Sequence, residues 1–272
     1  MCKIRLVWTL ASLALVTPAL AQDAPPAPSA VTPVSDRAWN LDNGKIELHG
    51  SLPIFGSNYS GGGSGSTFIL AGVGGAFGVS DQLELGGDYA FQASPNTDAA
   101  GVFAGHALFR VAHDQHMSAA LGGAALYSHA ADGIVIAAGL SLRYRLNKQV
   151  SIYTMSSGVP ICGGCLRILG PVTGQLVFAI PNNGSTEVFL NLPAGIGIQA
   201  SPELYVFGET SLGTFLLSPR TDSIVEFSDY FGITAGAWLS TSKELELGAA
   251  FADDLKHAGD IYIIELMARI HL

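Results

Sequence analysis

Cys162 and Cys165 form the most conspicuous local motif of the chain, because only two glycines separate them. A cysteine pair with this spacing can bind a metal ion, act as a redox couple or form a disulfide. No second pair of this kind and no nearby histidine accompanies it. The pair falls in a long connection of a chain that begins with an export signal, and exported proteins favour disulfides. We therefore expect a structural disulfide, with a metal or redox role and two free thiols as the alternatives.

Two further groups invite a metal or catalytic interpretation. His113 and His116 bracket Asp114, but these are too few ligands for a metal site without partners from elsewhere, and polar residues suit a turn. Ser128 and His129 are the only adjacent serine and histidine. Neighbours on a strand point to opposite faces, so this pair is not placed to act as nucleophile and base. We expect no metal ion, no cofactor and no enzymatic activity.

Arg143 and Arg145 lie one residue apart in the otherwise apolar run LSLRYRL, residues 140–146. In a soluble sheet these arginines would face water. In a membrane barrel, an arginine turned to lipid at mid-depth would cost roughly 2–4 kcal/mol, so both would face the lumen. The elements that carry the arginines decide between the two arrangements.

The N-terminus predicts export. Lys3 and Arg5 precede a short apolar run, residues 6–16, and the small residues Ala19 and Ala21 follow it, as in a signal peptide of residues 1–21. Residues 22–43 are rich in Pro, Ala and Ser and predict a disordered leader. Residues 44–272 show no further break in composition and are expected to form one domain.

Composition excludes several classes of protein. Loss of Lys3 and Arg5 with the signal leaves 11 Lys and Arg against 22 Asp and Glu, which argues against nucleic acid as a partner. Charged residues make up only 13% of the chain, about half the usual share of a soluble domain. After the signal, no apolar run reaches the roughly 20 residues that a membrane-spanning helix needs. The 33 glycines, many inside apolar runs, also disfavour helices and leave strands as the main element.

Apolar and polar residues alternate with period two along most of the chain, which is the pattern of strands. Between residues 134 and 146, for example, Ile134, Ile136 and Leu140 share one face, and Arg143 and Arg145 lie on the other. Short polar turns alternate with longer loops, as in outer-membrane barrels. The pattern predicts twelve strands, near 44–56, 66–79, 83–93, 100–112, 117–128, 134–146, 150–157, 186–200, 203–215, 229–241, 245–253 and 260–272.

The signal segment, the alternating strands and a final strand that ends the chain together resemble bacterial outer-membrane β-barrel proteins. The last residue of that superfamily is usually aromatic, whereas this chain ends in Leu272. The resemblance implies an all-β fold, a transmembrane antiparallel up-and-down barrel, in contact with the lipid of the bacterial outer membrane. The stretch 157–186 is long and contains the apolar segments LRIL (166–169) and QLVFAI (175–180). They predict either an extra hairpin, which would make fourteen strands, or a lid over the barrel mouth.

In such a barrel the alternation turns a set of charged side chains toward the lumen. We expect ion pairs between Glu84 and Arg110 and between Glu246 and Arg269, and closure should bring Glu47 beside the strand of Arg269. The predicted lumen network consists of Glu47, Glu84, Arg110, Arg143, Arg145, Glu246, Glu265 and Arg269.

These patterns favour a non-enzymatic outer-membrane barrel with a structural or surface-interaction role and a lumen filled by ion pairs. The alternative is a narrow, porin-like channel for small solutes. A secreted soluble β-sandwich is a third possibility. The sequence does not indicate an oligomeric state.

Overall fold

The computed structural model of the chain describes residues 31–57, 66–94, 98–128, 133–154, 175–182, 186–217, 226–227, 232–255, 258–259 and 261–272. Within these ranges the elements are one short 3-10 helix and fourteen strands. They are η1 (Val34–Asp36), β1 (Ile46–Ser57), β2 (Ser66–Gly78), β3 (Leu83–Ser94), β4 (Asp98–His113), β5 (Met117–Ser128), β6 (Gly133–Arg145), β7 (Val150–Tyr153), β8 (Leu176–Pro181), β9 (Glu187–Gln199), β10 (Leu204–Leu216), β11 (Glu226–Phe227), β12 (Gly232–Ser240), β13 (Leu245–Asp254) and β14 (Ile261–His271).

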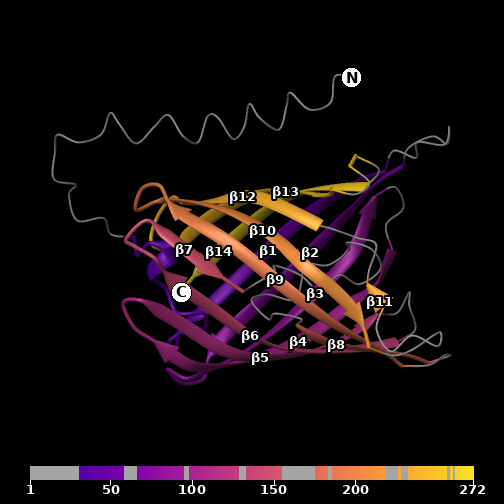
Figure 1. Ribbon diagram of the computed structural model, residues 1–272, viewed down its shortest axis with the longest axis horizontal. Coiled ribbons are helices and arrows are strands. Elements are labelled where there is room, and N and C mark those ends of the chain that lie inside the picture. The colour runs from indigo at the N-terminus through magenta and orange to yellow at the C-terminus, as the bar shows by residue number, and fades with distance from the viewer. Residues whose placement is uncertain are drawn as a thin grey trace. The chain divides into compact units, whose positions relative to one another are not determined.

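The strands close into a single antiparallel ring (Figure 1). β1 pairs with both β2 and β14, and β9 pairs with β10, so the sheet meets itself. β7 and β8 share one place between β6 and β9, while β11 pairs with β10 outside the ring. The ring therefore has twelve positions, which confirms the predicted twelve-stranded up-and-down barrel.

The seventh position of the ring is a strand broken at mid-depth. β7 follows β6 only from Arg145 to Arg143, and β8 resumes the pairing at Ala138. At the break, Thr154 Oγ1 and Gln175 Nε2 donate to the carbonyl oxygen of Leu140 at 2.9 and 3.0 Å, and Leu140 N donates to Gln175 Oε1 at 2.8 Å. Side chains thus make the hydrogen bonds to the backbone N–H and carbonyl groups of Leu140 that a continuous neighbouring strand would make.

The apolar segment QLVFAI is therefore neither an added hairpin nor a lid. Most of it forms β8, which completes the wall above β7, so the ring keeps the predicted twelve positions and the alternative of a fourteen-stranded ring does not form. The segment LRIL lies outside the described residues, as do Cys162, Cys165 and His129.

The two faces of the wall differ in chemistry as the alternation predicted. Large apolar side chains cover the outside, with Phe103 57% and Leu121 54% exposed. Inward carboxylates are buried, with Glu84 3% and Glu246 1% exposed. An apolar outer belt around a polar interior is the arrangement of membrane-spanning barrels. No helix within the described residues is long and apolar enough to cross a membrane.

Five short turns join strands at one end of the barrel, which we call the short-turn end, and all five are built alike. In each, a side-chain oxygen accepts hydrogen bonds from the backbone N–H groups two and three residues ahead, as in Asx and Ser/Thr turns. The accepting residues are Ser80, Asp114, Asn147, Ser201 and Ser242. Asp114 thus serves its own turn, and across the described residues no group of three or more His, Cys, Asp or Glu side chains could hold a metal ion.

Candidate functional site

Residues 31–43, which we call the inner segment, lie inside the barrel at the short-turn end. Val34, Ser35 and Asn40 are buried, with 5–8% of their surface exposed. The segment is joined to β1 by a turn in which Gly44, with φ of 75°, donates its N–H to the carbonyl oxygen of Gly78 at 2.8 Å. It corresponds to the second half of the expected disordered leader. Residues 31–43 are instead ordered, because they form ion pairs and hydrogen bonds with the lumen wall that the isolated segment could not form.

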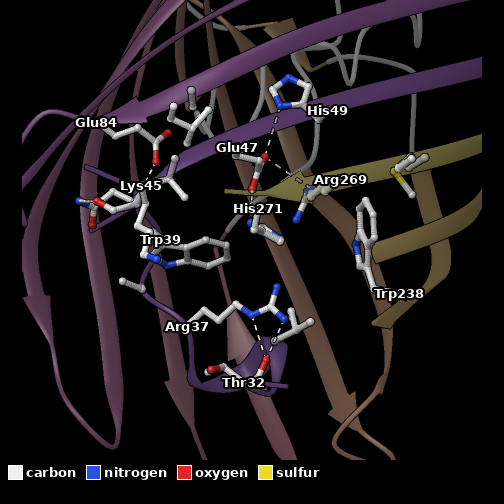
Figure 2. Close-up of a pocket in the computed structure, with 18 of the residues that line it drawn as sticks. Thr32, Arg37, Trp39, Lys45, Glu47, His49, Glu84, Trp238, Arg269 and His271 are labelled. Atoms are coloured by element: carbon white, nitrogen blue, oxygen red, sulfur yellow. Dashed lines mark hydrogen bonds and ion pairs between the residues drawn. The ribbon is translucent and has the colours of Figure 1, made fainter. Parts of the chain in front are cut away.

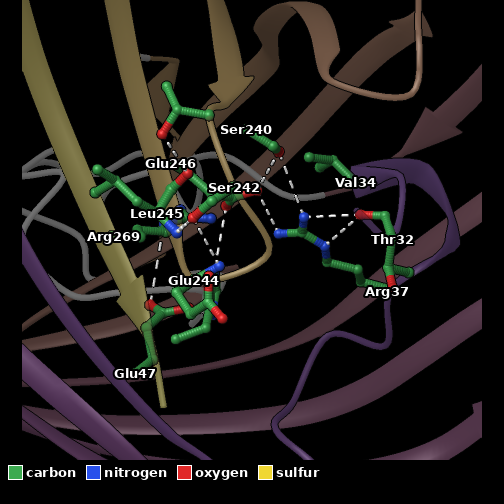
Figure 3. A network of polar contacts seen from close by, with 12 residues as sticks. Thr32, Val34, Arg37, Glu47, Ser240, Ser242, Glu244, Leu245, Glu246 and Arg269 are labelled. Carbon is green, nitrogen blue, oxygen red and sulfur yellow. Dashed lines mark hydrogen bonds and ion pairs between the residues drawn. The ribbon is translucent and has the colours of Figure 1, made fainter. Parts of the chain in front are cut away.

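Three ion pairs among the described residues join the inner segment to the wall. Arg37 Nη1 lies 2.5 Å from Glu246 Oε1, and Arg110 Nη2 lies 2.7 Å from Asp42 Oδ1. Asp36 pairs with Arg145. Figure 3 shows Arg37 held between Glu246 and Ser240 of the wall and Thr32 of its own segment.

Arg143 binds the inner segment through its backbone. The buried guanidinium donates to the carbonyl oxygens of Val34 at 2.6 Å and Arg37 at 3.3 Å, and its Cζ lies 4.1 Å from the centre of the Trp39 ring. A lumen filled by ion pairs would give Arg143 a carboxylate partner. Carbonyl oxygens and an aromatic face compensate the buried charge instead. Both arginines of LSLRYRL therefore face the lumen, and both hold the inner segment.

An alternating row of carboxylates and imidazoles, which we call the arc, runs along the inner wall across β4, β3, β1, β14 and β13. Successive nitrogen and oxygen atoms lie 2.5–3.5 Å apart. The arc consists, in order, of Glu84, His106, Asp88, His49, Glu47, His271 and Glu246. Both end carboxylates hold the inner segment: Glu246 pairs with Arg37, and Glu84 Oε2 accepts a hydrogen bond from Leu41 N at 2.7 Å.

Two glycines make room for the arc. Gly74 on β2 stands in register with His49 on one side and Asp88 on the other, so His49 reaches Asp88 across the bare backbone. A Cβ at position 74 would overlap both side chains. Gly86 on β3 does the same for the His106 ring, which lies across it.

Of the predicted charges, Glu47, Glu84, Arg143, Glu265 and Arg269 line the lumen cavity. Several of the predicted charges have other partners than expected. Glu84 and Arg110 do not form the predicted pair, because Glu84 contacts His106 and Leu41 N while Arg110 turns to Asp42. Glu246 and Arg269 stand in register on β13 and β14, yet Glu246 pairs with Arg37 and His271.

Arg269 contacts two other groups. It lies 3.9 Å from Glu47, the neighbour expected from closure, and its Cζ lies 4.0 Å from the centre of the Trp238 ring. Glu265 is buried in the β14 wall.

The three histidines of the arc and the charges of the inner segment are absent from the lumen network predicted from the sequence. The period-two alternation that placed Glu47 and Arg269 inward also places His49 and His271 inward, so that signal was present. Arg37, Asp36 and Asp42 carried no such signal, because they lie outside the alternating pattern.

The opposite part of the lumen wall is aromatic. Tyr153, Tyr205, Phe207 and Trp238 are buried and lie over glycines of the neighbouring strands, Gly195, Gly197, Gly236 and Gly248. Val34 belongs to this cluster, and Trp39 packs against it with its ring centre 6.4 Å from that of Tyr153. The inner segment therefore turns apolar residues to the aromatic side, and its charged residues pair with charged groups of the wall.

A cavity of about 850 Å³ remains beside the inner segment. It extends from Lys45 and Leu272 at the short-turn end to Glu209 and Glu265 deeper in the lumen. Figure 2 shows Arg37 and Trp39 of the inner segment pointing into it, toward Arg269 and His271 of the wall. The inner segment thus narrows the lumen without filling it.

Comparison with known proteins bears on the fold. No family model matches the chain, and no curated protein sequence matches it significantly. Among solved structures, the NanC porin matches with a TM-score of 0.51 and 6% identity, over 83% of this chain and 98% of that chain. A KdgM porin in complex with disordered oligogalacturonate matches with a TM-score of 0.50 and 6% identity, over the same shares. The chain therefore has the porin-like fold of bacterial outer-membrane β-barrels.

Proposed function

We propose that this chain is an outer-membrane channel for small solutes, and that solutes pass through the cavity beside the inner segment. The cavity of about 850 Å³ carries this proposal, because it connects the short-turn end with the deeper lumen. Its size falls within the range of pockets that hold small molecules, about 300–1,000 Å³. The porin-like fold supports the same function. The proposal involves no catalytic step.

The location follows from the same features. The apolar outer belt suits lipid, and the predicted signal peptide, residues 1–21, would direct export. The short turns would then face the periplasm, as in outer-membrane barrels generally. The disulfide between Cys162 and Cys165 stays a prediction, which thiol titration of the unreduced protein would test.

A closed barrel with a structural or surface-interaction role is the second candidate. The ion pairs and hydrogen bonds of the inner segment favour it, because a wall bound to its own N-terminal segment leaves less lumen free for solutes.

Conductance in planar bilayers separates the two candidates. Ser51 lines the cavity, and its neighbour Leu52 is exposed on the outer face, so each can receive the same bulky group. We expect wild-type protein to form steady channels, Ser51→Trp to conduct less, and Leu52→Trp to conduct as wild type does. Wild-type protein that inserts into the bilayer but never conducts would favour the closed barrel.

A further inference from the structure

We propose that the lumen wall is a peptide-binding site, which the inner segment occupies in this structure, and that a separate short peptide fits the same site. Short peptides are then a class of solute that the channel accepts. This inference rests on the proposed channel function for its consequence, a change in current. It does not rest on that function for the binding of the peptide.

Side chains from five strands of the wall bind the backbone of the inner segment. The contacts step from β9 and β6 through β5 and β4 to β3 as the segment advances from residue 34 to residue 41. The bonds are Arg143 Nη1 to the carbonyl oxygens of Val34 at 2.6 Å and Arg37 at 3.3 Å, Ser35 N to Gln199 Oε1 at 3.1 Å, Trp39 N to Ser118 Oγ at 3.2 Å, Arg110 Nη2 to the carbonyl oxygen of Asn40 at 3.2 Å, and Leu41 N to Glu84 Oε2 at 2.7 Å. The wall thus presents a linear row of partners for one peptide chain.

These bonds recognise a peptide backbone and not a particular sequence. They engage three N–H groups and three carbonyl oxygens, which other peptides also carry. Glu84, Ser118, Arg143 and Gln199 are buried, with 3–6% of their surface exposed. Buried polar groups cost free energy when they are left without partners. The wall therefore favours an occupant that offers backbone donors and acceptors at this spacing.

The side chains of the segment indicate which peptides bind best. Arg37 pairs with Glu246 at 2.5 Å. Two residues later, the Trp39 ring lies against Arg143 and Tyr153, with its centre 4.1 Å from Arg143 Cζ. The site therefore favours a peptide with a basic residue two positions before an aromatic one.

The geometry allows one occupant to replace another. The inner segment forms no strand pairing with the described wall, so its departure breaks no part of the ring. Within the described residues, its covalent link to the ring is the turn of Gly44, ahead of β1. The cavity of about 850 Å³ beside the segment is lined by Glu84 and Arg143, which also bind the segment. An entering peptide therefore reaches the same side chains from this cavity.

A fluorescently labelled peptide with the sequence of residues 31–43 tests the site on the full chain in lipid vesicles, with fluorescence anisotropy as the measurement. In wild type the tethered segment competes at an effective concentration on the order of 1 mM, so binding should need peptide near that concentration. Arg37→Gln with Trp39→Ala in the full chain, the released variant, weakens the segment and should bind the peptide at least about tenfold more tightly. Lys148→Gln changes an exposed turn and should bind as wild type does.

Two further comparisons test where the peptide binds and what it must be. Added to the released variant, Ser118→Ala removes the acceptor of one backbone N–H and should weaken peptide binding roughly 2–10-fold. Ser151→Ala is the matched control, because this buried serine of β7 contacts Tyr205. A peptide with alanine at every position except the equivalents of Arg37 and Trp39 should still bind, whereas the neutral oligosaccharide maltopentaose should not.

The outcomes are distinct. Peptide binding that also lowers the current of the released variant in planar bilayers supports both proposals. Peptide binding to a barrel that never conducts keeps the peptide site and overturns the channel. A conducting barrel that binds no peptide, either as the released variant or after deletion of residues 31–42, overturns the peptide site and keeps the channel. Equal affinities of the Ser118→Ala and Ser151→Ala proteins would place the peptide elsewhere and also overturn the site.

Discussion

At the scale of single residues, the contacts in the lumen depend on glycines, which have no side chain, as much as on the charged and aromatic residues that pack over them. His49 reaches Asp88, and His106 lies between Glu84 and Asp88, only because Gly74 and Gly86 leave the backbone bare. The aromatic side uses the same device, with Tyr153 over Gly195 and other rings over glycines. Glycines that weaken a strand in isolation thus make room for the lumen contacts.

Gly86→Ala tests this view. Its Cβ would overlap the His106 ring, so the ring must move and the arc must break, at a cost of about 1–3 kcal/mol in the free energy of unfolding. The control is Gly105→Ala on β4, where a Cβ would lie 3.9 Å from its nearest neighbour, the Gly86 carbonyl oxygen. Denaturant unfolding in detergent measures both. Equal stability of the two variants would show that the arc does not depend on the space at position 86.

At the scale of elements, the five short turns share one hydrogen-bonding pattern. Each must reverse the chain between two antiparallel strands, and each uses a side-chain oxygen to satisfy two backbone N–H groups at the reversal. In the turn of Asp114, these bonds from the N–H groups of His116 and Met117 lower the pKa of the carboxyl group.

Asp114→Asn provides a test through pH. The variant keeps the accepting oxygen but does not titrate. Because the Asp114 pKa is lowered in the folded state, its extra stability is present above the ordinary carboxyl pKa of about 4 and is lost as pH falls through the lowered value. The free energy of unfolding of wild type should therefore fall relative to the variant in acid. Parallel pH profiles of the two proteins would contradict this account of the turn.

At the scale of the whole molecule, the barrel separates an apolar outside from a polar and aromatic inside, and the N-terminal inner segment belongs to the inside. Its Val34 and Trp39 face the aromatic wall, and its Arg37 and Asp42 face charged groups. The lumen is therefore narrowed by a segment whose apolar residues pack against the aromatic part of the wall and whose charged residues pair with charged residues of the wall.

The outer belt yields a prediction that depends on depth. Leu121 lies in the middle of β5 on the outer face, whereas the equally exposed Leu146 lies at a short turn. Leu121→Arg should destabilise the protein in lipid by about 2–4 kcal/mol, and Leu146→Arg by about 0–1 kcal/mol. Unfolding in lipid vesicles measures the difference. Equal effects would mean that the two positions do not differ in depth.

The strands, the short turns and the face of each wall residue could be predicted from local sequence patterns. Period-two alternation assigns a residue to one face whatever its neighbours are, so Arg143, Glu84 and Arg269 were placed inward without any knowledge of their partners. Turn residues act over three or four positions, which is also local information. For these reasons eleven of the twelve strand positions could be predicted close to their observed bounds, and the seventh only in its first part, β7.

The contacts between groups in the lumen could not be predicted from such patterns, because they depend on the folded barrel. Glu84 and Arg110 lie on the neighbouring strands β3 and β4, but Arg110 pairs with Asp42 and Glu84 accepts a hydrogen bond from Leu41 N, both in the inner segment. The position of β8 could not be predicted either, because β8 pairs with the part of β6 that β7 leaves unpaired. Contacts of this kind join residues far apart in the chain. They exist only once the ring has closed around the segment, so no local pattern records them.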